Sequence, residues 1–357
     1  MKKPELNLIN STIASARKLK NDIAIIVVAN VNTNNDYHAH SLKTEFFAEN
    51  EYEEIITGFR ENGFYVLLQR NEMEFFRWYL NGGIKETGKK YVAVYNAASG
   101  GNGPGKKSLI PAFCNLNKIP ITSSNPYVVS LCRHKYHINC LLQNHGMPVP
   151  KSSYFSKDFN WLLDNRPEIG NKVIAKPTYE SASIGVDDSS VFNYSKESDK
   201  FLYNLSETFS QPIIIQEFVS GYEIEVPIIV KKGIPNAVNV IGLGLDDVKL
   251  INDRILTYDI VYKDNYSFYD FNEFGESFNQ TLLTAAKSVA QIIGIEGFGR
   301  VDFRITPERD YYIMDVSTYP HIIHHSSFWY MFEQLNFHYR DLFALMLGLT
   351  GDRYNWK

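Results

Sequence analysis

Apolar and polar positions in the first third of the chain predict an α/β arrangement. Ile23 to Ala29 is an unbroken apolar run rich in β-branched residues, which is typical of a strand buried on both faces of a parallel sheet. Apolar residues then recur at helical spacing from Tyr52 to Phe59, and Gly63 predicts the end of that helix. Further strands are expected at Phe64 to Leu68 and at Tyr91 to Tyr95.

The rest of the chain predicts two α+β units. Asn125 and Pro126 suit the cap and the first turn of a helix that is expected to run to Gly146. The elements expected after it are strands at Lys172 to Lys176, Pro212 to Phe218 and Glu223 to Val230, a helix from Leu282 to Ile293, and strands at Phe298 to Ile305 and Tyr311 to Ser317. We therefore expect three domains, at residues 1–124, 125–215 and 216–357.

Composition argues against several classes of protein. The 357 residues carry 36 Lys and Arg against 40 Asp and Glu, and this net charge of −4 does not suit a polybasic nucleic-acid binder. The three cysteines form no CxxC pair, so neither a disulfide framework nor a zinc ribbon is indicated, and a reducing, cytoplasmic setting fits best. The longest apolar run, Ile23 to Ala29, is far shorter than the roughly 20 residues that a membrane helix needs.

The last two predicted strands carry the strongest chemical signal. Alternation along each strand is expected to place two sets of side chains on one face each: Arg300, Asp302 and Arg304 in the first strand, and Ile313, Asp315 and Ser317 in the second. With the turn centred between Glu308 and Arg309, Asp302 lies opposite Asp315. Two opposed carboxylates repel each other, and a bound cation would relieve that conflict. Oxygen ligands beside a hydroxyl suit Mg²⁺ shared with phosphate oxygens, and a charged face paired with the two arginines is the alternative.

Two further segments are candidates for phosphate binding. Gly100 to Lys107 matches GxxxxGK with Lys106 as its lysine, but the hydroxyl expected directly after that lysine is absent. A P-loop, a substrate-site loop and a plain surface turn stay open for this segment. Lys176 ends an apolar strand and needs an anion there, and the small residues from Ser181 to Gly185 can fold over a phosphate.

Taken in order, these features resemble the ATP-grasp superfamily and, within it, the D-alanine:D-alanine ligases. The resemblance extends roughly from Ser99 to Leu349. It rests on the motifs Leu109-Ile110-Pro111, Ile119 to Asn125, Lys176-Pro177 with Glu180 and Ser183 to Gly185, Gln216 to Glu223, Gly297 to Asp302, and Asp315 to Pro320 with His325-Ser326. It implies a three-domain fold that holds ATP between the central and carboxyl-terminal α+β domains, with substrates reached from an amino-terminal α/β domain.

The resemblance also implies roles for individual residues. The ATP-binding roles fall to Lys135, Lys176, Ser183, Gln216, Glu217, Val219, Glu223 and Lys263. Of these, the lysines and the serine would contact phosphates, the segment from Gln216 to Val219 would bind adenine, and Glu223 would bind the ribose. The implied Mg²⁺ ligands are Asp302, Asp315 and Ser317. Arg300 would steady the tetrahedral intermediate, and Ser326 would bind the carboxylate of the acceptor.

Several positions near the carboxyl terminus depart from the family pattern. Ser317 stands where Asn is usual and Asp315 where Glu is usual, so a second Mg²⁺ is expected to sit differently or to bind more weakly. His321 replaces a glycine whose backbone helps to bind the oxyanion. Together with His324 and His325 it could suggest zinc, but no closed ligand set accompanies the three, and a substrate-facing role and structural histidines are the alternatives.

The amino-terminal part departs from the family on the donor side. The glycine and glutamate signature that holds the first D-alanine is absent, and Asn30 to Asn35 stand in its place. Ala182 replaces a serine as well. We therefore expect a donor other than D-alanine, unless Glu45 or Glu49 folds back over the site and supplies the missing carboxylate.

The sequence thus predicts ATP-dependent ligation of a carboxylate donor to an amino-acid-like amine through an acyl phosphate, with ATP and Mg²⁺ as cofactors. The expected partners are small-molecule substrates, with no nucleic acid and no membrane, and a homodimer is left open. Two alternatives also stay open. One is a nucleotide-binding ATP-grasp protein without ligase activity, motivated by Ser317 and His321, and the other is a P-loop NTPase that uses Lys106.

Overall fold

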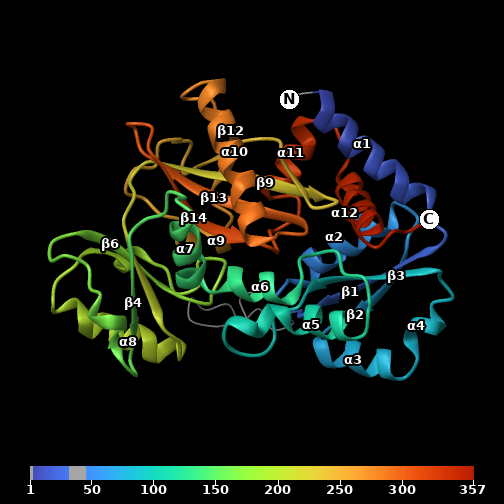
Figure 1. Ribbon diagram of the computed structural model, residues 1–357, viewed down its shortest axis with the longest axis horizontal. Helices are drawn as coiled ribbons and strands as arrows, with labels where there is room; N and C mark the ends of the chain where they lie inside the picture. Colours follow the sequence, from blue (N-terminus) through green and yellow to red (C-terminus); the bar gives the residue numbers. More distant parts are fainter. Residues whose placement is uncertain (1–2, 32–45) are drawn as a thin grey trace.

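The computed structural model describes residues 3–31 and 46–357 as three sheets surrounded by helices (Figure 1). The first sheet is parallel, with the strand order β2-β1-β3, and is made of β1 (Ile23–Ala29), β2 (Tyr65–Gln69) and β3 (Tyr91–Ala97). Every residue of β1 is fully buried. This confirms the α/β prediction for the start of the chain, although β2 begins one residue later than expected.

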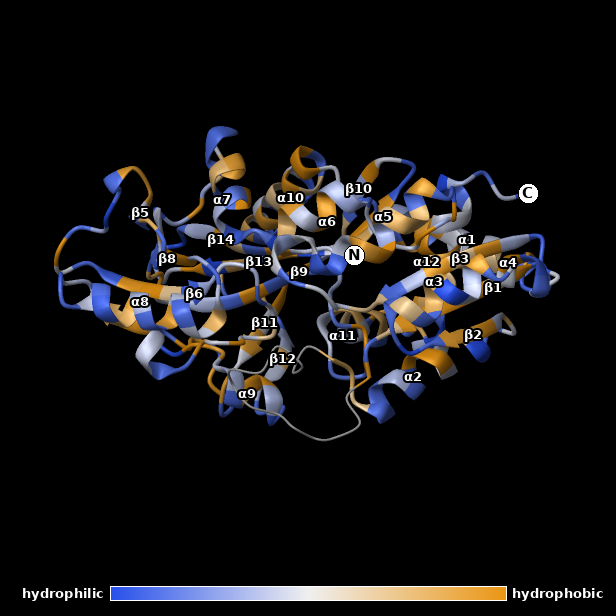
Figure 2. Ribbon diagram, turned by 90° about the horizontal axis from the view of Figure 1, so that it is seen from below, coloured by the Kyte–Doolittle hydropathy of each residue, from blue (hydrophilic) through white to orange (hydrophobic). Residues whose placement is uncertain are grey.

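Helices cover both faces of the first sheet. On one face lie α1 (Lys3–Lys18), α2 (Glu49–Arg60) and α12 (Tyr339–Arg353). On the other lie α3 (Glu72–Leu80), the short α4 (Gly83–Glu86) and α5 (Leu109–Leu116), the last preceded by the 3₁₀ helix η2 (Gly103–Ser108). Figure 2 shows hydrophobic residues prominent along β1, β3 and α12, where these layers meet. The first and last helices of the chain, α1 and α12, thus pack side by side.

The central sheet is antiparallel and lies at the left of Figure 1. Its strand order is β5-β4-β8-β6-β7. The strands are β4 (Ser152–Ser156), β5 (Asn160–Trp161), β6 (Lys172–Pro177), β7 (Val191–Asn193) and β8 (Ile213–Glu217). The helix α8 (Ser198–Phe209) packs its apolar side against them, and η3 (Leu162–Asp164) and η4 (Asp188–Ser190) are short connecting turns.

The carboxyl-terminal sheet has the order β12-β11-β9-β13-β14, with β10 beside β9. Its strands are β9 (Tyr222–Lys231), β10 (Ile234–Ala237), β11 (Ile241–Gly244), β12 (Ser267–Asp270), β13 (Gly297–Ile305) and β14 (Tyr311–Ser317). The helix α10 (Glu276–Ile293) packs on one face, and α11 (Ser327–Gln334) packs on the other. The short α9 (Tyr258–Tyr262) stands between β11 and β12 in the chain.

The helix predicted from Asn125 to Gly146 is wrong in one respect, because the structure divides it in two. Asn125 caps α6 (Pro126–Arg133) as expected, and α7 (Lys135–Asn144) follows after a break at His134. The backbone of His134 has φ −96° and ψ 84°, and its Nδ1 accepts the N–H of His137 at 3.3 Å, which caps the second helix. The break puts Lys135 in the first turn of α7.

The register of β13 and β14 confirms that Asp302 lies opposite Asp315. The turn between the two strands, however, differs from the predicted one. The turn is one residue tighter than expected, and an irregularity after Asp302 restores the pairing by bulging out Met314. The bulge reverses the side chains beyond it. Ile313 therefore lies opposite Phe303 in the core and does not share the face of Asp315, which corrects the predicted set.

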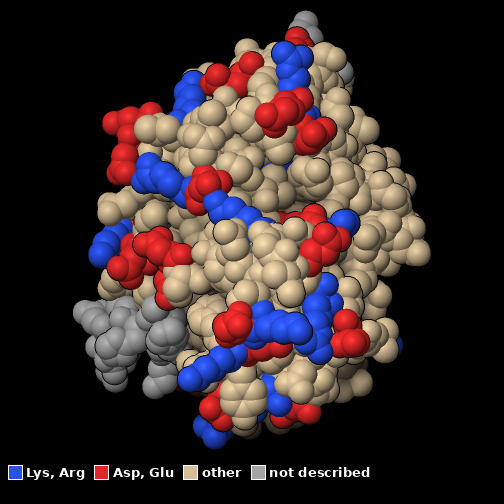
Figure 3. Space-filling model, turned by 90° about the vertical axis from the view of Figure 1, so that its left-hand side faces the viewer, with Lys and Arg blue, Asp and Glu red and all other residues tan. Residues whose placement is uncertain are grey.

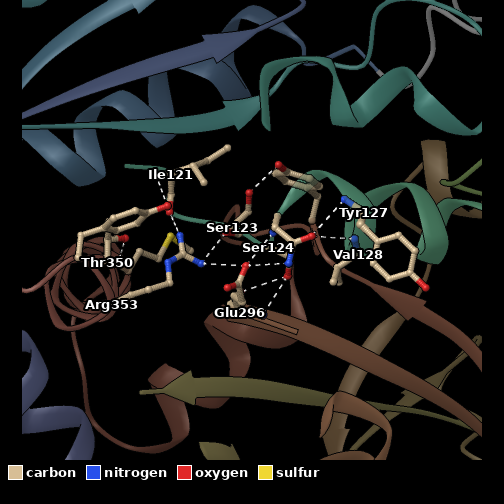
Figure 4. A network of polar contacts seen from close by, with 12 residues as sticks. Ile121, Ser123, Ser124, Tyr127, Val128, Glu296, Thr350 and Arg353 are labelled. Carbon is tan, nitrogen blue, oxygen red and sulfur yellow. Dashed lines mark hydrogen bonds and ion pairs between the residues drawn. The ribbon is translucent and has the colours of Figure 1, made fainter. Parts of the chain in front are cut away.

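A polar network joins the amino-terminal domain to the start of β13 (Figure 4). Glu296 Oε2 accepts the backbone N–H of Asn125 at 2.9 Å and lies 3.6 Å from Arg353 Nη1. The same Arg353 nitrogen donates to the carbonyl of Ser123 at 2.8 Å. At Gly297, where φ is +71°, a Cβ atom would lie 2.3 Å from the carbonyl oxygen of Thr122, so only glycine allows this approach.

The surface shows no dominance of either charge on the face in Figure 3, where Lys and Arg alternate with Asp and Glu. Within residues 3–31 and 46–357, none of the helices combines the length and the apolar character that crossing a membrane would require.

Candidate active site

A cavity of about 830 Å³ is lined by all three sheets and lies in the size range of small-molecule sites. Tyr95 of β3, Lys176 of β6 and Asp302 of β13 all reach it. Among the candidate residues, the structure brings together around this cavity Lys135, Lys176, Ser183, Val219, Glu223, Arg300, Asp302, Asp315 and Ser317. Residues as far apart in the sequence as Lys135 and Ser317 thus share one site.

Two lysines define one part of the cavity. The backbone N–H of Lys135 donates to the carbonyl of Thr178 at 3.2 Å, which fixes the first turn of α7 to the central sheet. Its Nζ lies 3.7 Å from Asp315 Oδ2. Burial lowers the pKa of Lys176, although Asp315 works in the opposite direction. Ser183 lines the same part of the cavity in a left-handed loop conformation, with φ 54°. This arrangement suits a polyanion such as a phosphate chain.

The segment that ends β8 and begins β9 forms a second wall. Val219 and Glu223 line the cavity, whereas the side chain of Gln216 is buried within the sheet and Glu217 pairs with Lys151 at the surface. The carboxylate of Glu223 forms an ion pair with Arg304. Backbone groups of this segment therefore reach the site more readily than the side chains of Gln216 and Glu217.

The opposed carboxylates lie on the third wall. Arg300 donates from Nε and Nη2 to the two oxygens of Asp302, at 2.7 and 2.8 Å. Burial raises the pKa of Asp302 to about 7, against the effect of Arg300. Burial acts in the same sense on Asp315, but Lys135 and Lys176 outweigh it and lower the pKa of that carboxyl. Asp302 is thus both opposed to a carboxylate and paired with an arginine, but it is buried and not part of a solvated charged face.

His321 and Glu51 face each other across the side of the cavity nearest the first sheet. His321 Nε2 lies 3.6 Å from Glu51 Oε1, and its ring stacks on Phe47 with centroids 5.6 Å apart. Enclosure in the cavity and the nearby Arg300 lower the pKa of His321. Burial raises the pKa of Glu51.

Besides Gln216 and Glu217, two more predicted site residues, Ser326 and Lys263, are not among the described residues that line the cavity. Ser326 caps α11: its Oγ donates to the carbonyl of Ile323 at 2.6 Å and accepts the N–H of Trp329. Lys263 ends α9 and pairs with Asp259 at 3.3 Å on the surface. The structure therefore places both near the site but engages them elsewhere.

Lys106 does not stand in a phosphate-binding loop. Its segment forms η2, and its Nζ pairs with Glu180 Oε2 at 2.8 Å, with both side chains buried. Glu180 also lies 3.6 Å from Arg133 and accepts the side-chain N–H of Gln211 at 2.8 Å. The glycine-rich segment thus anchors the loop after β6 to the amino-terminal domain, which counts against the P-loop alternative.

The three neighbouring histidines do not converge on one point. His324 pairs with Glu54, His325 pairs with Asp264, and His321 faces Glu51. Among the described residues, no group of three or more His, Cys, Asp or Glu side chains is arranged to hold a metal ion. The described residues therefore do not support a zinc site at these histidines.

Sequence reasoning missed two carboxylates in the cavity, Glu51 and Glu225. Glu49, which was considered as a substitute donor ligand, pairs with Arg70 at 2.6 Å in an exposed position, while Glu45 lies outside the described residues. Glu225 could have been noticed, because it is a second charge at alternate spacing from Glu223 in an otherwise apolar strand.

Solved structures with the same fold include two ligases. The D-alanine–D-alanine ligase of Bacillus anthracis, crystallised in complex with ATP, superimposes with a TM-score of 0.68 at 15% identity, over 93% of this chain and 99% of that one. The VanG D-Ala:D-Ser ligase of Enterococcus faecalis gives a TM-score of 0.64 at 17% identity, over 92% and 99% of the two chains. The chain therefore has the ATP-grasp fold of these ligases.

Sequence comparison leads to the family. Residues 141–348 match the family model described as D-ala D-ala ligase C-terminus, and the chain belongs to that family. The D-alanine–D-alanine ligase of Neisseria meningitidis serogroup A is 27% identical over 227 residues, which cover 62% of this chain and 69% of the relative. That of an Azoarcus species is 24% identical over 243 residues, or 68% and 74% of the two chains. The protein is an ATP-dependent, ADP-forming carboxylate–amine ligase.

Proposed function

We propose that this ligase uses ATP and Mg²⁺ to join a small carboxylate donor to an amino-acid-like amine. The observation that carries the proposal is the opposed pair Asp302 and Asp315 in a cavity whose facing wall supplies Lys135 and Lys176. Carboxylates and lysines arranged in this way suit the phosphates and the metal of a bound nucleotide at the same time.

The nucleotide roles follow from the positions of the side chains. Lys135 and Lys176 would neutralise the phosphates, with Ser183 in the loop that covers them. The backbone from Gln216 to Val219 would form hydrogen bonds with the adenine. Glu223 would accept hydrogen bonds from the ribose hydroxyls while it stays paired with Arg304. Lys263 would join the phosphates only if its side chain turned from Asp259 into the cavity, which α9 already borders.

The donor set on β13 and β14 fits Mg²⁺, because Asp302, Asp315 and Ser317 offer hard oxygen ligands side by side. When bound there, the metal would withdraw charge from the terminal phosphate of ATP. Asp302 must give up its contacts with Arg300 in part to serve as a ligand. That exchange would free the guanidinium to face the reacting carbonyl.

The reaction would proceed in two transfers. The donor carboxylate attacks the γ-phosphorus, which breaks the bond to the β-phosphate oxygen and yields an acyl phosphate and ADP. The amine then attacks the acyl carbon, phosphate leaves, and the amine loses a proton as the amide forms. Arg300 would stabilise the oxyanion of the intermediate, and Ser326 would contact the acceptor carboxylate after releasing its helix-capping bonds.

The wall made by Phe47, Glu51 and His321 would select the donor. The relatives named above are D-alanine–D-alanine ligases, and their first substrate carries an ammonium group. Glu51 is the carboxylate that this chain offers to such a group, but its oxygens already serve the N–H of Ala48 and face His321. A donor other than D-alanine therefore stays our prediction.

A substrate panel tests the proposal. ADP release and amide formation are measured with ATP, Mg²⁺ and D-alanine alone, and then with varied donor carboxylates beside a fixed amino-acid acceptor. We expect ADP and amide in equal amounts for at least one pair, and a poor rate with D-alanine alone. Efficient formation of D-alanyl-D-alanine would refute the donor prediction, and ADP release without any amide would refute ligation.

A further inference from the structure

Glu225 is a buried carboxylate of the cavity that has no part in the roles proposed above. It lies on β9, in register with Asp302 of β13, and it lines the cavity. The residue is 7% exposed. Its Oε1 forms an ion pair with Arg300 Nη1 at 3.0 Å. A carboxylate at this depth is costly unless hydrogen-bond donors satisfy both of its oxygens.

The second oxygen of Glu225 lacks such a donor. Within residues 3–31 and 46–357, Oε2 is buried and makes no hydrogen bond. Burial raises the pKa of Glu225, while Arg300 and the nearby hydroxyl of Ser327 oppose that shift. The Ser327 hydroxyl, in the first turn of α11, is the donor that lies beside this carboxylate, although the two do not reach full hydrogen-bond geometry. Glu225 Oε2, next to the cavity, is therefore a hydrogen-bond acceptor without a well-formed hydrogen bond.

The charge of the cavity changes from one end to the other. Lys135 and Lys176 make the phosphate end positive. At the other end stand Glu51 and Glu225, the latter paired with Arg300, and the half-buried ring of Tyr266 completes the wall; Lys107 also lines the cavity and acts on His321. Arg300 is already shared between Glu225 and Asp302. This end of the cavity suits a group that brings a positive charge and N–H donors.

We propose that Glu225 binds the ammonium group of the acceptor and thereby makes the enzyme select amines. The inference rests on the proposed function, because it assigns one substrate of that reaction to one end of the site. Glu225 lies between Arg300, proposed at the reacting carbonyl, and α11, whose Ser326 is expected to contact the acceptor carboxylate. An ammonium on Glu225 Oε2 would thus stand beside the acyl carbon, held by a charge-assisted hydrogen bond. It passes one proton to the carboxylate of Glu225, and the neutral amine that results attacks the carbon.

The test compares two acceptors in the Glu225→Gln variant, which keeps the shape of the side chain and removes its charge. The first acceptor is the amino acid that the wild type uses in the substrate panel, and the second is hydroxylamine. Hydroxylamine is uncharged at pH 7.5 and traps acyl phosphates as hydroxamates. We expect KM for the amino acid to rise at least tenfold, while hydroxamate formation from the same donor stays within about twofold of wild type.

Matched variants separate binding from structure. Ser327→Ala removes the neighbouring hydroxyl and should leave KM for the amino acid within about twofold of wild type. Glu225→Asp keeps the charge on a shorter side chain and should raise that KM by less than Glu225→Gln does. If Glu225→Gln fails to fold, the Asp variant decides, because a rise in KM for the amino acid alone is still required.

Two results would overturn the inference. One is an unchanged KM for the amino acid in Glu225→Gln, and the other is a parallel loss of hydroxamate formation or a raised Mg²⁺ requirement, which would indicate a donor or metal role. A wild type that forms neither amide nor hydroxamate with any donor would instead contradict the proposed function itself.

Discussion

Glu180→Gln should destabilise the protein because it removes a carboxylate from two buried cations. Glu180 is 4% exposed and Lys106 is 3% exposed, with Nζ and Oε2 2.8 Å apart, and Arg133 lies 3.6 Å from the same oxygen. Removing one partner of a buried ion pair costs about 3–5 kcal/mol. Because glutamine keeps a polar oxygen near Gln211 and Lys106, we expect a loss at the lower end, about 3 kcal/mol.

A double variant distinguishes this cause from simple disruption. Lys106→Met combined with Glu180→Gln removes both charges, and it should recover about half of the stability that Glu180→Gln loses. Urea unfolding, followed by circular dichroism and by tryptophan fluorescence, measures the free energy of unfolding of the single and the double variant. Coincidence of the two unfolding curves checks that unfolding is two-state. The exposed pair of Glu49 and Arg70 supplies the control, since Glu49→Gln should barely move the midpoint.

The reasoning fails if Glu180→Gln costs less than about 1 kcal/mol, or if the losses of the two single variants simply add in the double variant. Either result would mean that the buried pair does not hold the loop after β6 to η2.

Three further variants test separate parts of the account. Lys176→Ala should raise KM for ATP about 10- to 100-fold by loss of a charge-assisted contact, whereas Lys106→Met should change it less than about threefold; the reverse order would restore the P-loop alternative. Burial and His137 lower the pKa of His134 to about 4, so as the pH falls the unfolded chain is protonated first, and the free energy of unfolding should fall between about pH 6.5 and pH 4. His134→Asn should flatten this dependence of the unfolding free energy on pH. An equal pH dependence of the variant in urea unfolding would contradict the prediction. Gly297→Ala should lower Tm more than Gly233→Ala, because both residues have positive φ but only Gly297 faces a carbonyl at 2.3 Å, and equal losses would show that the contact with Thr122 does not matter.

Local patterns predicted the parts of the fold that depend on local chemistry. The unbroken apolar run of β1 requires burial on both faces, and the structure supplies helices on each. Asn125 caps α6 because its side chain accepts the N–H groups of Tyr127 and Val128. The pairing of Asp302 with Asp315 was also predicted, but the bulge at Met314 that produces it has no signature in the sequence.

Contacts between segments that are distant in the sequence could not be predicted from such local patterns. The break at His134 is accompanied by a bond from the Lys135 N–H to the carbonyl of Thr178, a residue far along the chain beyond β6. Glu51 and Glu225 reach one cavity because α2 and β9 converge there, and although the spacing of Glu225 from Glu223 sets it apart in its strand, nothing in the segment of Glu51 does so. Ser326 and Lys263 carry the family motif but are held by local bonds, a distinction that depends on three-dimensional placement.

The most direct test of the central claim is the release of ADP by the wild type and by Asp302→Asn, measured with and without a donor and an acceptor. The account predicts that wild-type ADP appears in step with amide and only when both substrates are present. In Asp302→Asn, turnover should be lost while Tm shows that the fold is kept, because one of the two opposed carboxylates can no longer serve the metal. Full activity in that variant would contradict the site that we assign.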